Sequence, residues 1–314
     1  MLHRFATPIL FGLLALIWGS SFLFIKLALE GMSPVQVVVG RLGFGALTLV
    51  IVMLVTRVRC PRARGVWQRM LVVSVLLCVV PFLLFAWAGQ HIPSGLSSIY
   101  NATTPIMTML VSLVALPDER LTAMRTLGLF IAAAGVVLVA APWTINFDNG
   151  PTSLLAQLAC LGATLCYGLG IVAMRRLIRN RSEDATTIAT VQVVIGAAVA
   201  GLLVPFFGLA PMRLDASVII GIVLLGALGT GVAYVWSTRV VQEWGATRAS
   251  TVTYLTPIVG VVLGMLVLGE RLHWNEPVGG VVVLLGVLLA QGARFAQGGG
   301  AVRLRRGASA GRAT

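Results

Sequence analysis

Acidic residues are scarce in this sequence. It holds only ten Asp and Glu among 314 residues, and charged residues of both signs make up 11% of it. A soluble domain carries about 25% charged residues. With 58% hydrophobic residues and a mean hydropathy of +0.97, the chain has more apolar surface than a water-soluble fold could cover. The scarcity of charge therefore excludes a soluble globular domain and indicates that lipid is the solvent for most of the chain.

Residues that bind metals or act in catalysis are also few. The three histidines and four cysteines are His3, His91, His273, Cys60, Cys78, Cys160 and Cys166. The cysteines lack the spacing of metal ligands, so we interpret them as small hydrophobic residues. The sequence has no HExxH or GxSxG motif and no pair of intramembrane aspartates. We therefore expect no enzyme activity, no cofactor and no metal site.

Long apolar runs dominate the rest of the sequence. A helix that crosses the hydrocarbon core, roughly 30 Å thick, needs about 20 apolar residues. Ten stretches qualify: residues 8–29, 34–55, 66–89, 95–116, 122–141, 151–175, 185–208, 214–238, 246–268 and 274–294. The first resembles a signal peptide, but it is too long and has no small-residue cleavage site, so we expect it to be retained. The predicted fold is an all-α membrane protein with ten transmembrane helices, since lipid cannot satisfy open backbone groups.

The basic residues predict how these helices are oriented. A net charge of +13 does not indicate nucleic-acid binding here, because the basic residues stand singly or in short clusters between apolar runs. With both termini in the cytoplasm, 19 of the 23 Lys and Arg fall in cytoplasmic segments. Only Arg213 and Arg271 fall outside, and Lys26 and Arg41 lie within spans. The positive-inside rule therefore predicts cytoplasmic termini.

The second half of the chain repeats the first. Residues 94–139 recur as residues 246–289, with an offset of 152 up to Pro105 and Pro257 and an offset of 151 beyond them. Each half has five spans, and an odd number inserts the second half from the opposite side of the membrane. This is the inverted-repeat plan of secondary transporters, with a substrate site near the midplane between the halves. The predicted first repeat, second repeat and disordered basic tail are residues 1–142, 143–295 and 296–314.

Several short motifs occur in register in the two halves. They are Trp18-Gly-Ser-Ser-Phe with Lys26, Arg41, Pro105 with Glu119-Arg120-Leu121 and Gly135, and Pro257 with Gly269-Glu270-Arg271-Leu272 and Gly286. On these motifs the sequence resembles the EamA-type transporters of the drug/metabolite transporter superfamily, from about Leu10 to Leu289. The resemblance implies a carrier of small metabolites in the bacterial inner membrane, often an exporter of amino acids or related compounds.

The fourth and ninth spans each carry a small or polar face with a proline near the middle. Candidate substrate-binding residues on them are Tyr100, Asn101, Thr104, Pro105, Ser250, Tyr254 and Pro257. The face can serve close helix packing, or it can line a cavity into which each proline frees a carbonyl group. We favour packing for the glycines. We favour the cavity for Asn101 and for the hydroxyl groups beside the prolines, because the Asn101 amide would be costly against lipid.

Large aromatic residues lie within several spans. Trp18 lies at the centre of the first span, which is the wrong depth for an interfacial anchor. With Tyr167, Trp236 and the nearby Ser21, it can give a broad and adaptable site for organic molecules. The alternative for each aromatic ring alone is ordinary bundle core, but as a group they favour a cavity.

Arg41 is a charge within the second span, about 10 Å below the outer surface at the helical rise. At that depth it needs a partner or water. It either attracts a substrate carboxylate or anchors its helix to polar neighbours such as Glu30. Its counterpart in the second half is Gln192, and this match favours the anchor.

Charged residues at the ends of spans have a structural interpretation. Lys26 is close enough to the end of its span to reach the interface with its amino group. Glu119 and Glu270 occupy matching positions at opposite faces of the membrane. Each lies near the start of the following helix, where the helix dipole favours a carboxylate.

No Asp or Glu lies in the middle of any predicted span. An exchanger of protons against cationic drugs commonly needs a buried carboxylate there. We therefore expect an exporter of zwitterionic or neutral small metabolites such as amino acids, working by alternating access, as a monomer or homodimer. The alternative within the carrier class is a multidrug or quaternary-cation exporter.

Overall fold

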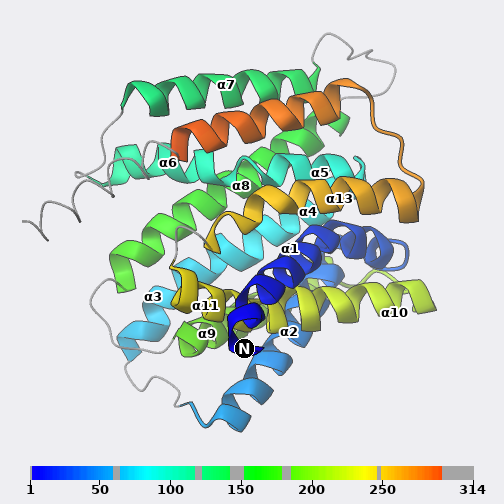
Figure 1. Cartoon of the computed structure of the whole chain (residues 1–314). Helices are drawn as coiled ribbons and strands as arrows, with labels where there is room; N and C mark the ends of the chain where they lie inside the picture. Colours follow the sequence, from blue (N-terminus) through cyan, green and yellow to red (C-terminus); the bar gives the residue numbers. More distant parts are fainter. Residues whose placement is uncertain are drawn as a thin grey trace, which may run out of the picture.

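The computed structural model describes residues 2–58, 64–116, 122–141, 152–178, 185–245 and 249–291, which form helices and short turns without any strand (Figure 1). The helices are α1 (Leu2–Leu29), α2 (Pro34–Thr56), α3 (Arg64–Ser74), α4 (Val80–Gly89), α5 (Ser94–Asn101), α6 (Thr104–Ala115), α7 (Ala123–Ala140), α8 (Thr152–Ile178), α9 (Ala185–Phe207), α10 (Ala216–Val223), α11 (Ala233–Trp244), α13 (Val252–Leu268) and the final helix (Asn275–Gln291). Two π-helical segments, η1 (Val75–Val79) and η4 (Leu224–Val232), lie inside the third and eighth spans.

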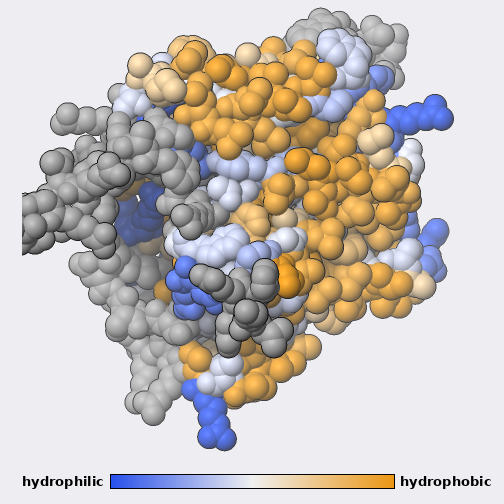
Figure 2. All heavy atoms as spheres, in the orientation of Figure 1, coloured by the Kyte–Doolittle hydropathy of each residue, from blue (hydrophilic) through white to orange (hydrophobic). Residues whose placement is uncertain are grey.

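The described helices confirm the predicted all-α membrane fold. Eight spans are long and apolar enough to cross a membrane, and α13 and the final helix are shorter apolar helices. Large apolar side chains point outward, among them Phe130 and Leu266, which are 68% and 78% exposed. Figure 2 shows a broad apolar area on the face in view, as contact with lipid requires. The predicted tail at 296–314 lies outside the described residues.

The third and eighth spans share an irregularity of the backbone at equivalent positions. The offset of 152 that aligns Pro105 with Pro257 also aligns Cys78 with Thr230. Each of the latter two lies in a π-helical segment, η1 or η4. A π-helical turn widens the helix locally and is frequent at functional sites. The repeat therefore extends to an irregularity of the backbone, at the same place in both halves.

Glycines hold α7 against the final helix, as Figure 1 shows. A Cβ atom on Gly128 would lie 2.6 Å from the carbonyl oxygen of Gly286, and one on Gly286 would lie 2.7 Å from that of Gly128. The same reciprocal contact links Gly135 and Gly279, with 2.9 Å in both directions. Backbones can approach this closely only where both helices lack a side chain. These glycines pack the two helices together within the chain, and the contact relates the two repeats by a local two-fold axis.

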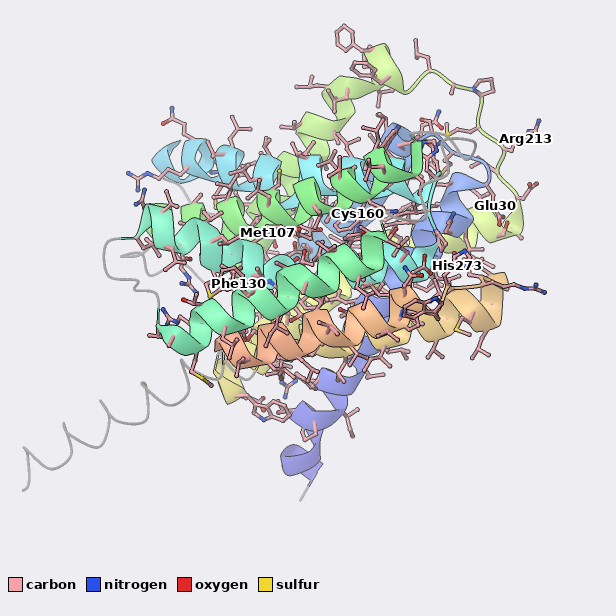
Figure 3. All side chains as sticks on the ribbon, turned by 90° about the horizontal axis from the view of Figure 1, so that it is seen from above. Glu30, Met107, Phe130, Cys160, Arg213 and His273 are labelled. Carbon is pink, nitrogen blue, oxygen red and sulfur yellow. The ribbon has the colours of Figure 1, made fainter. Side chains whose placement is uncertain are left out.

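The two halves are joined by hydrogen bonds at the end where α5 and α10 begin. Gln36 Nε2 donates to the carbonyl oxygens of Gly208 and Ala210 over 2.8 and 2.6 Å. The Arg213 amide donates to the carbonyl oxygen of Gly31 over 2.9 Å. Figure 3 shows Glu30, Arg213 and His273 gathered at this end. We call it the outer end, following the orientation that the sequence predicts.

Candidate functional site

Six side chains lie close together in the interior. They occupy three pairs of equivalent positions, with one member of each pair in the first repeat and the other in the second. The pairs are Arg41 with Gln192, Cys78 with Thr230, and Phe82 with Tyr234, and we call these six residues the Arg41 centre. The members of a pair are 151 or 152 positions apart, the offsets that align the repeats. Cys78 and Thr230 lie near the middle of the spans at 64–89 and 216–244, which places the centre at mid-membrane depth.

The Arg41 guanidinium is held on two sides. Its Nε donates to Thr230 Oγ1 over 3.2 Å. Its Cζ lies 3.6 Å from the centroid of the Phe82 ring, a stacked cation–π contact that fixes the plane of the group. The Thr230 hydroxyl itself donates to the carbonyl oxygen of Leu225, five residues earlier, over 3.4 Å. The π-helical turn of η4 thus orients the hydroxyl so that a lone pair is left for Arg41.

The other repeat makes the equivalent contact with neutral groups. Gln192 Nε2 on α9 donates to Cys78 Sγ in η1 over 3.2 Å. The Tyr234 hydroxyl lies within hydrogen-bonding reach of the same thiol. When the two repeats are exchanged, Arg41 on α2 corresponds to Gln192 on α9, and Thr230 in η4 corresponds to Cys78 in η1. The contact between α2 and η4 therefore corresponds to the contact between α9 and η1. The pseudo-two-fold axis of an inverted repeat therefore passes through this centre.

Two members of the centre, Arg41 and Tyr234, and the nearby Tyr167 lie deep in the protein without being fully buried. Arg41, Tyr167 and Tyr234 are enclosed by protein on all sides, yet each keeps an intermediate exposed fraction. Their side chains are therefore not fully packed against their neighbours.

Glu30 does not partner Arg41, which corrects one detail of the predicted anchor. The Glu30 carboxylate accepts from Ser217 Oγ over 3.0 Å at the outer end. The groups that interact electrostatically with Arg41 are Tyr167, Tyr234 and Cys78. No carboxylate is among them in the part of the chain that the structure describes.

The carbonyl groups freed by the two prolines already have local partners. Pro105 lies in the first turn of α6 after a break at 102–103, and Thr104 Oγ1 donates to the carbonyl oxygen of Asn101 over 2.7 Å. Pro257 lies within an unbroken α13, and Thr256 Oγ1 donates to the carbonyl oxygen of Thr253 over 3.0 Å. Both hydroxyl groups are therefore bonded to backbone carbonyl oxygens of their own spans. The Asn101 side chain is half-buried, and it has no hydrogen bond to any residue within the described ranges.

The other predicted site residues are dispersed. Trp18 is half-buried and packs on a core cluster that includes Leu14 and Val252. The Ser21 hydroxyl is buried and donates to the carbonyl oxygen of Ile17 over 3.1 Å, beside η4. Trp236 in α11 is half-buried.

Two tyrosines of the predicted set make specific hydrogen bonds. Tyr100 is only 1% exposed, and its hydroxyl donates to Gln157 Oε1 over 2.7 Å. The Tyr254 hydroxyl donates to Gln291 Oε1 over 2.5 Å. Ser250 is exposed ahead of α13. Of the twelve predicted residues, the structure thus brings Tyr167 to Arg41 and places Tyr100 in packed core.

Glu270 caps a helix of the opposite repeat, not the helix that follows it in sequence. Its carboxylate accepts from the backbone amides of Ser94 and Gly95 over 2.7 and 3.1 Å, and from Ser94 Oγ over 2.9 Å. These groups form the amino-terminal end of α5, where the helix dipole favours a carboxylate. Lys26 is half-buried and lies near enough to Glu270 to interact with it electrostatically. Glu119 lies outside the described residues.

Five residues of the Arg41 centre were not predicted as site residues, although Gln192 was noted as the counterpart of Arg41. The others are Cys78, Phe82, Thr230 and Tyr234. The offset of 152, applied to the third and eighth spans, would have paired them. Their proximity to Arg41 could not be predicted, because it depends on how the spans pack.

Comparisons with known proteins agree with this architecture. The EamA-like transporter family matches the chain twice, over residues 6–141 and 154–291. The uncharacterized transporter YoaV of Bacillus subtilis (strain 168) is 22% identical, over 87% of this chain and 92% of its own. A probable terminal-alkyne amino-acid exporter of Streptantibioticus cattleyicolor is 27% identical, over 87% of this chain and 89% of its own. A probable amino-acid metabolite efflux pump of Escherichia coli (strain K12) is 22% identical, over 88% of this chain and 92% of its own.

A solved crystal structure shares the fold. It superposes with a TM-score of 0.63 at 18% sequence identity, covering 91% of this chain and 96% of that one. At this identity the likeness concerns the arrangement of the helices. The double family match and this superposition agree with a chain built from two similar halves.

Proposed function

Because the chain belongs to the EamA-like transporter family, we propose that it exports small zwitterionic or neutral metabolites, such as amino acids, by alternating access. The observation that carries the proposal is the Arg41 centre, where polar side chains from both repeats gather at mid-span depth. A site on the pseudo-two-fold axis can be reached from either side when the repeats exchange conformations. Two relatives named as amino-acid exporters or efflux pumps support this substrate class.

The contacts between the halves support a state closed at the outer end. There, Gln36 and Glu270 join elements of opposite repeats through five hydrogen bonds. Release of a substrate on that side requires these bonds to break. We further propose a bacterial inner-membrane location with cytoplasmic termini, since basic residues concentrate in the segments assigned to the inside.

The centre favours this substrate class over the alternative of a multidrug or quaternary-cation exporter. Arg41 would repel a cation at close range. The described spans also offer no carboxylate beside Arg41 that could bind one. An amino acid at neutral pH brings a carboxylate to the arginine and carries no net charge.

Transport by the purified full chain in proteoliposomes tests the proposal. We expect counterflow of at least one radiolabelled amino acid or related metabolite from a broad panel. We expect Trp18→Ala and Asn101→Ala to reduce that flux while membrane expression is preserved. Phe130→Ala is the matched control, because this aromatic side chain faces outward on α7 (Figure 3) and should leave the flux unchanged. Absence of flux across the whole panel would refute the function, and normal flux in both variants would refute the predicted roles of Trp18 and Asn101 on the transport path.

A further inference from the structure

Most of the hydrogen-bonding capacity of Arg41 is unused. A guanidinium has five N–H donors. One of them, Nε–H, is bonded to Thr230, and the four on the terminal nitrogens have no partner among the described residues. These nitrogens are also not sealed in protein, since Arg41 is not among the buried polar groups without partners. The edge of the guanidinium that carries these nitrogens is therefore not covered by protein atoms.

The charge of Arg41 is unmatched as well. The groups that face it are the Tyr167 and Tyr234 phenols and the Cys78 thiol, none of which is an acid of ordinary strength at neutral pH. An unpaired cation inside a membrane protein is costly. The Phe82 ring offsets only part of that cost, because a cation–π contact is weaker than an ion pair in such surroundings. The described residues around Arg41 thus supply no anion to balance its charge.

We propose that Arg41 binds the carboxylate group of the transported solute. The two terminal nitrogens of a guanidinium match the two oxygens of a carboxylate in a bidentate pair. Phe82 and Thr230 hold the group from its face and from Nε, so the edge that a carboxylate needs stays free. The counterpart Gln192 is neutral, so the carboxylate end of a solute belongs on the Arg41 side of the centre. This inference rests on the proposed function and names the substrate class of that site.

A pair of probes of the same shape tests the inference without knowledge of the natural substrate. Benzoate and benzamide differ in charge but hardly in size. We expect benzoate to raise the thermal stability of the detergent-purified full chain in a saturable manner, and benzamide to have little effect. Equal effects of the two probes in the natural protein would overturn the inference, whatever the variants show.

Variants assign the effect to Arg41. Arg41→Gln installs the residue that already occupies the equivalent position at Gln192, so the fold should tolerate it. We expect the apparent affinity for benzoate to fall roughly tenfold to a hundredfold, the range for loss of hydrogen bonds to a charged group. Arg41→Lys keeps the positive charge but lacks the two parallel N–H donors of the guanidinium. Its apparent affinity for benzoate should lie between those of the natural protein and Arg41→Gln. Arg239→Gln removes the same charge from an exposed ion pair with Glu243 and should bind benzoate normally. Equal loss in Arg239→Gln, or normal binding in Arg41→Gln and Arg41→Lys, would refute the assignment.

The two proposals fail in different ways. If benzoate binds through Arg41 but no amino acid is transported, the proposed function fails and the carboxylate site stands. If amino acids are transported, and their amides compete with the flux as well as the acids do, the function stands and the carboxylate site fails.

Discussion

Substitutions at the reciprocal contact between α7 and the final helix test the pseudo-symmetry of the two repeats directly. Replacing Gly128 by Ala places a methyl group 2.6 Å from the carbonyl oxygen of Gly286 and 2.6 Å from the amide nitrogen of Ala290. Both obstructing atoms belong to the backbone, so no side-chain rotation can relieve the contact. The helices must separate by about 1 Å to restore an ordinary van der Waals distance.

The expected cost follows from this geometry. Overpacking of a close contact costs about 1–3 kcal/mol, and contact with backbone belongs at the upper end of that range. Alanine regains up to about 1 kcal/mol of helix propensity over glycine. We therefore expect Gly128→Ala to destabilise the protein by about 2 kcal/mol. Gly12→Ala is the matched control, since a Cβ atom there meets nothing within 4 Å, and it should be neutral or stabilising.

Thermal unfolding of the purified protein in detergent measures these differences. The pseudo-symmetry requires Gly279→Ala to behave like Gly128→Ala, because the two positions are equivalent. The double variant of Gly128 and Gly286 should cost less than the sum of the single variants, since the helices need to separate only once. If Gly128→Ala melts like Gly12→Ala, or if Gly279→Ala has no effect, the proposed pairing of these helices is refuted.

Two further predictions concern the outer end. Glu270→Gln should accelerate amide hydrogen exchange at Ser94 and its neighbour by roughly tenfold to a hundredfold, because a charge-assisted cap is worth about 1.5–3 kcal/mol; unchanged exchange would show that the cap contributes nothing. Gln36→Leu should lower the stability by about 1–3 kcal/mol, since it leaves the carbonyl groups of Gly208 and Ala210 without their donor, and a melting temperature equal to that of the unmodified protein would contradict this.

Patterns of composition predicted most of the architecture, because lipid permits few alternatives. An apolar run of about 20 residues in a membrane has to be a helix. The glycines of the ninth span were likewise predicted to pack closely, and Gly260 and Gly264 lie against Ser98 and Ser94 of the other repeat. Local patterns of this kind specify which face of a helix packs tightly.

Contacts between distant segments were not predictable in this way. Glu270 was expected to cap the helix after it, but the chain folds so that its carboxylate meets α5 of the other repeat. The prolines were expected to expose carbonyl groups, but Thr104 and Thr256 occupy them from one turn away. In both cases the residue type predicted the kind of interaction, while the partner depended on the packing of helices far apart in sequence.

The asymmetry of the Arg41 centre has a consequence for transport. The two repeats share the same backbone arrangement here, but the side chains at equivalent positions differ. The cation of Arg41 corresponds to the amide of Gln192, and the thiol of Cys78 corresponds to the hydroxyl of Thr230. A centre with equal sides would bind both ends of an amino acid alike, and the solute could enter in two orientations. On the proposed mechanism, the carboxylate has one preferred position because Arg41 stands on one side only, and that position stays with the first repeat when the repeats exchange conformations. The solute can then cross from one access route to the other without turning round, since the charge that orients it belongs to the site itself.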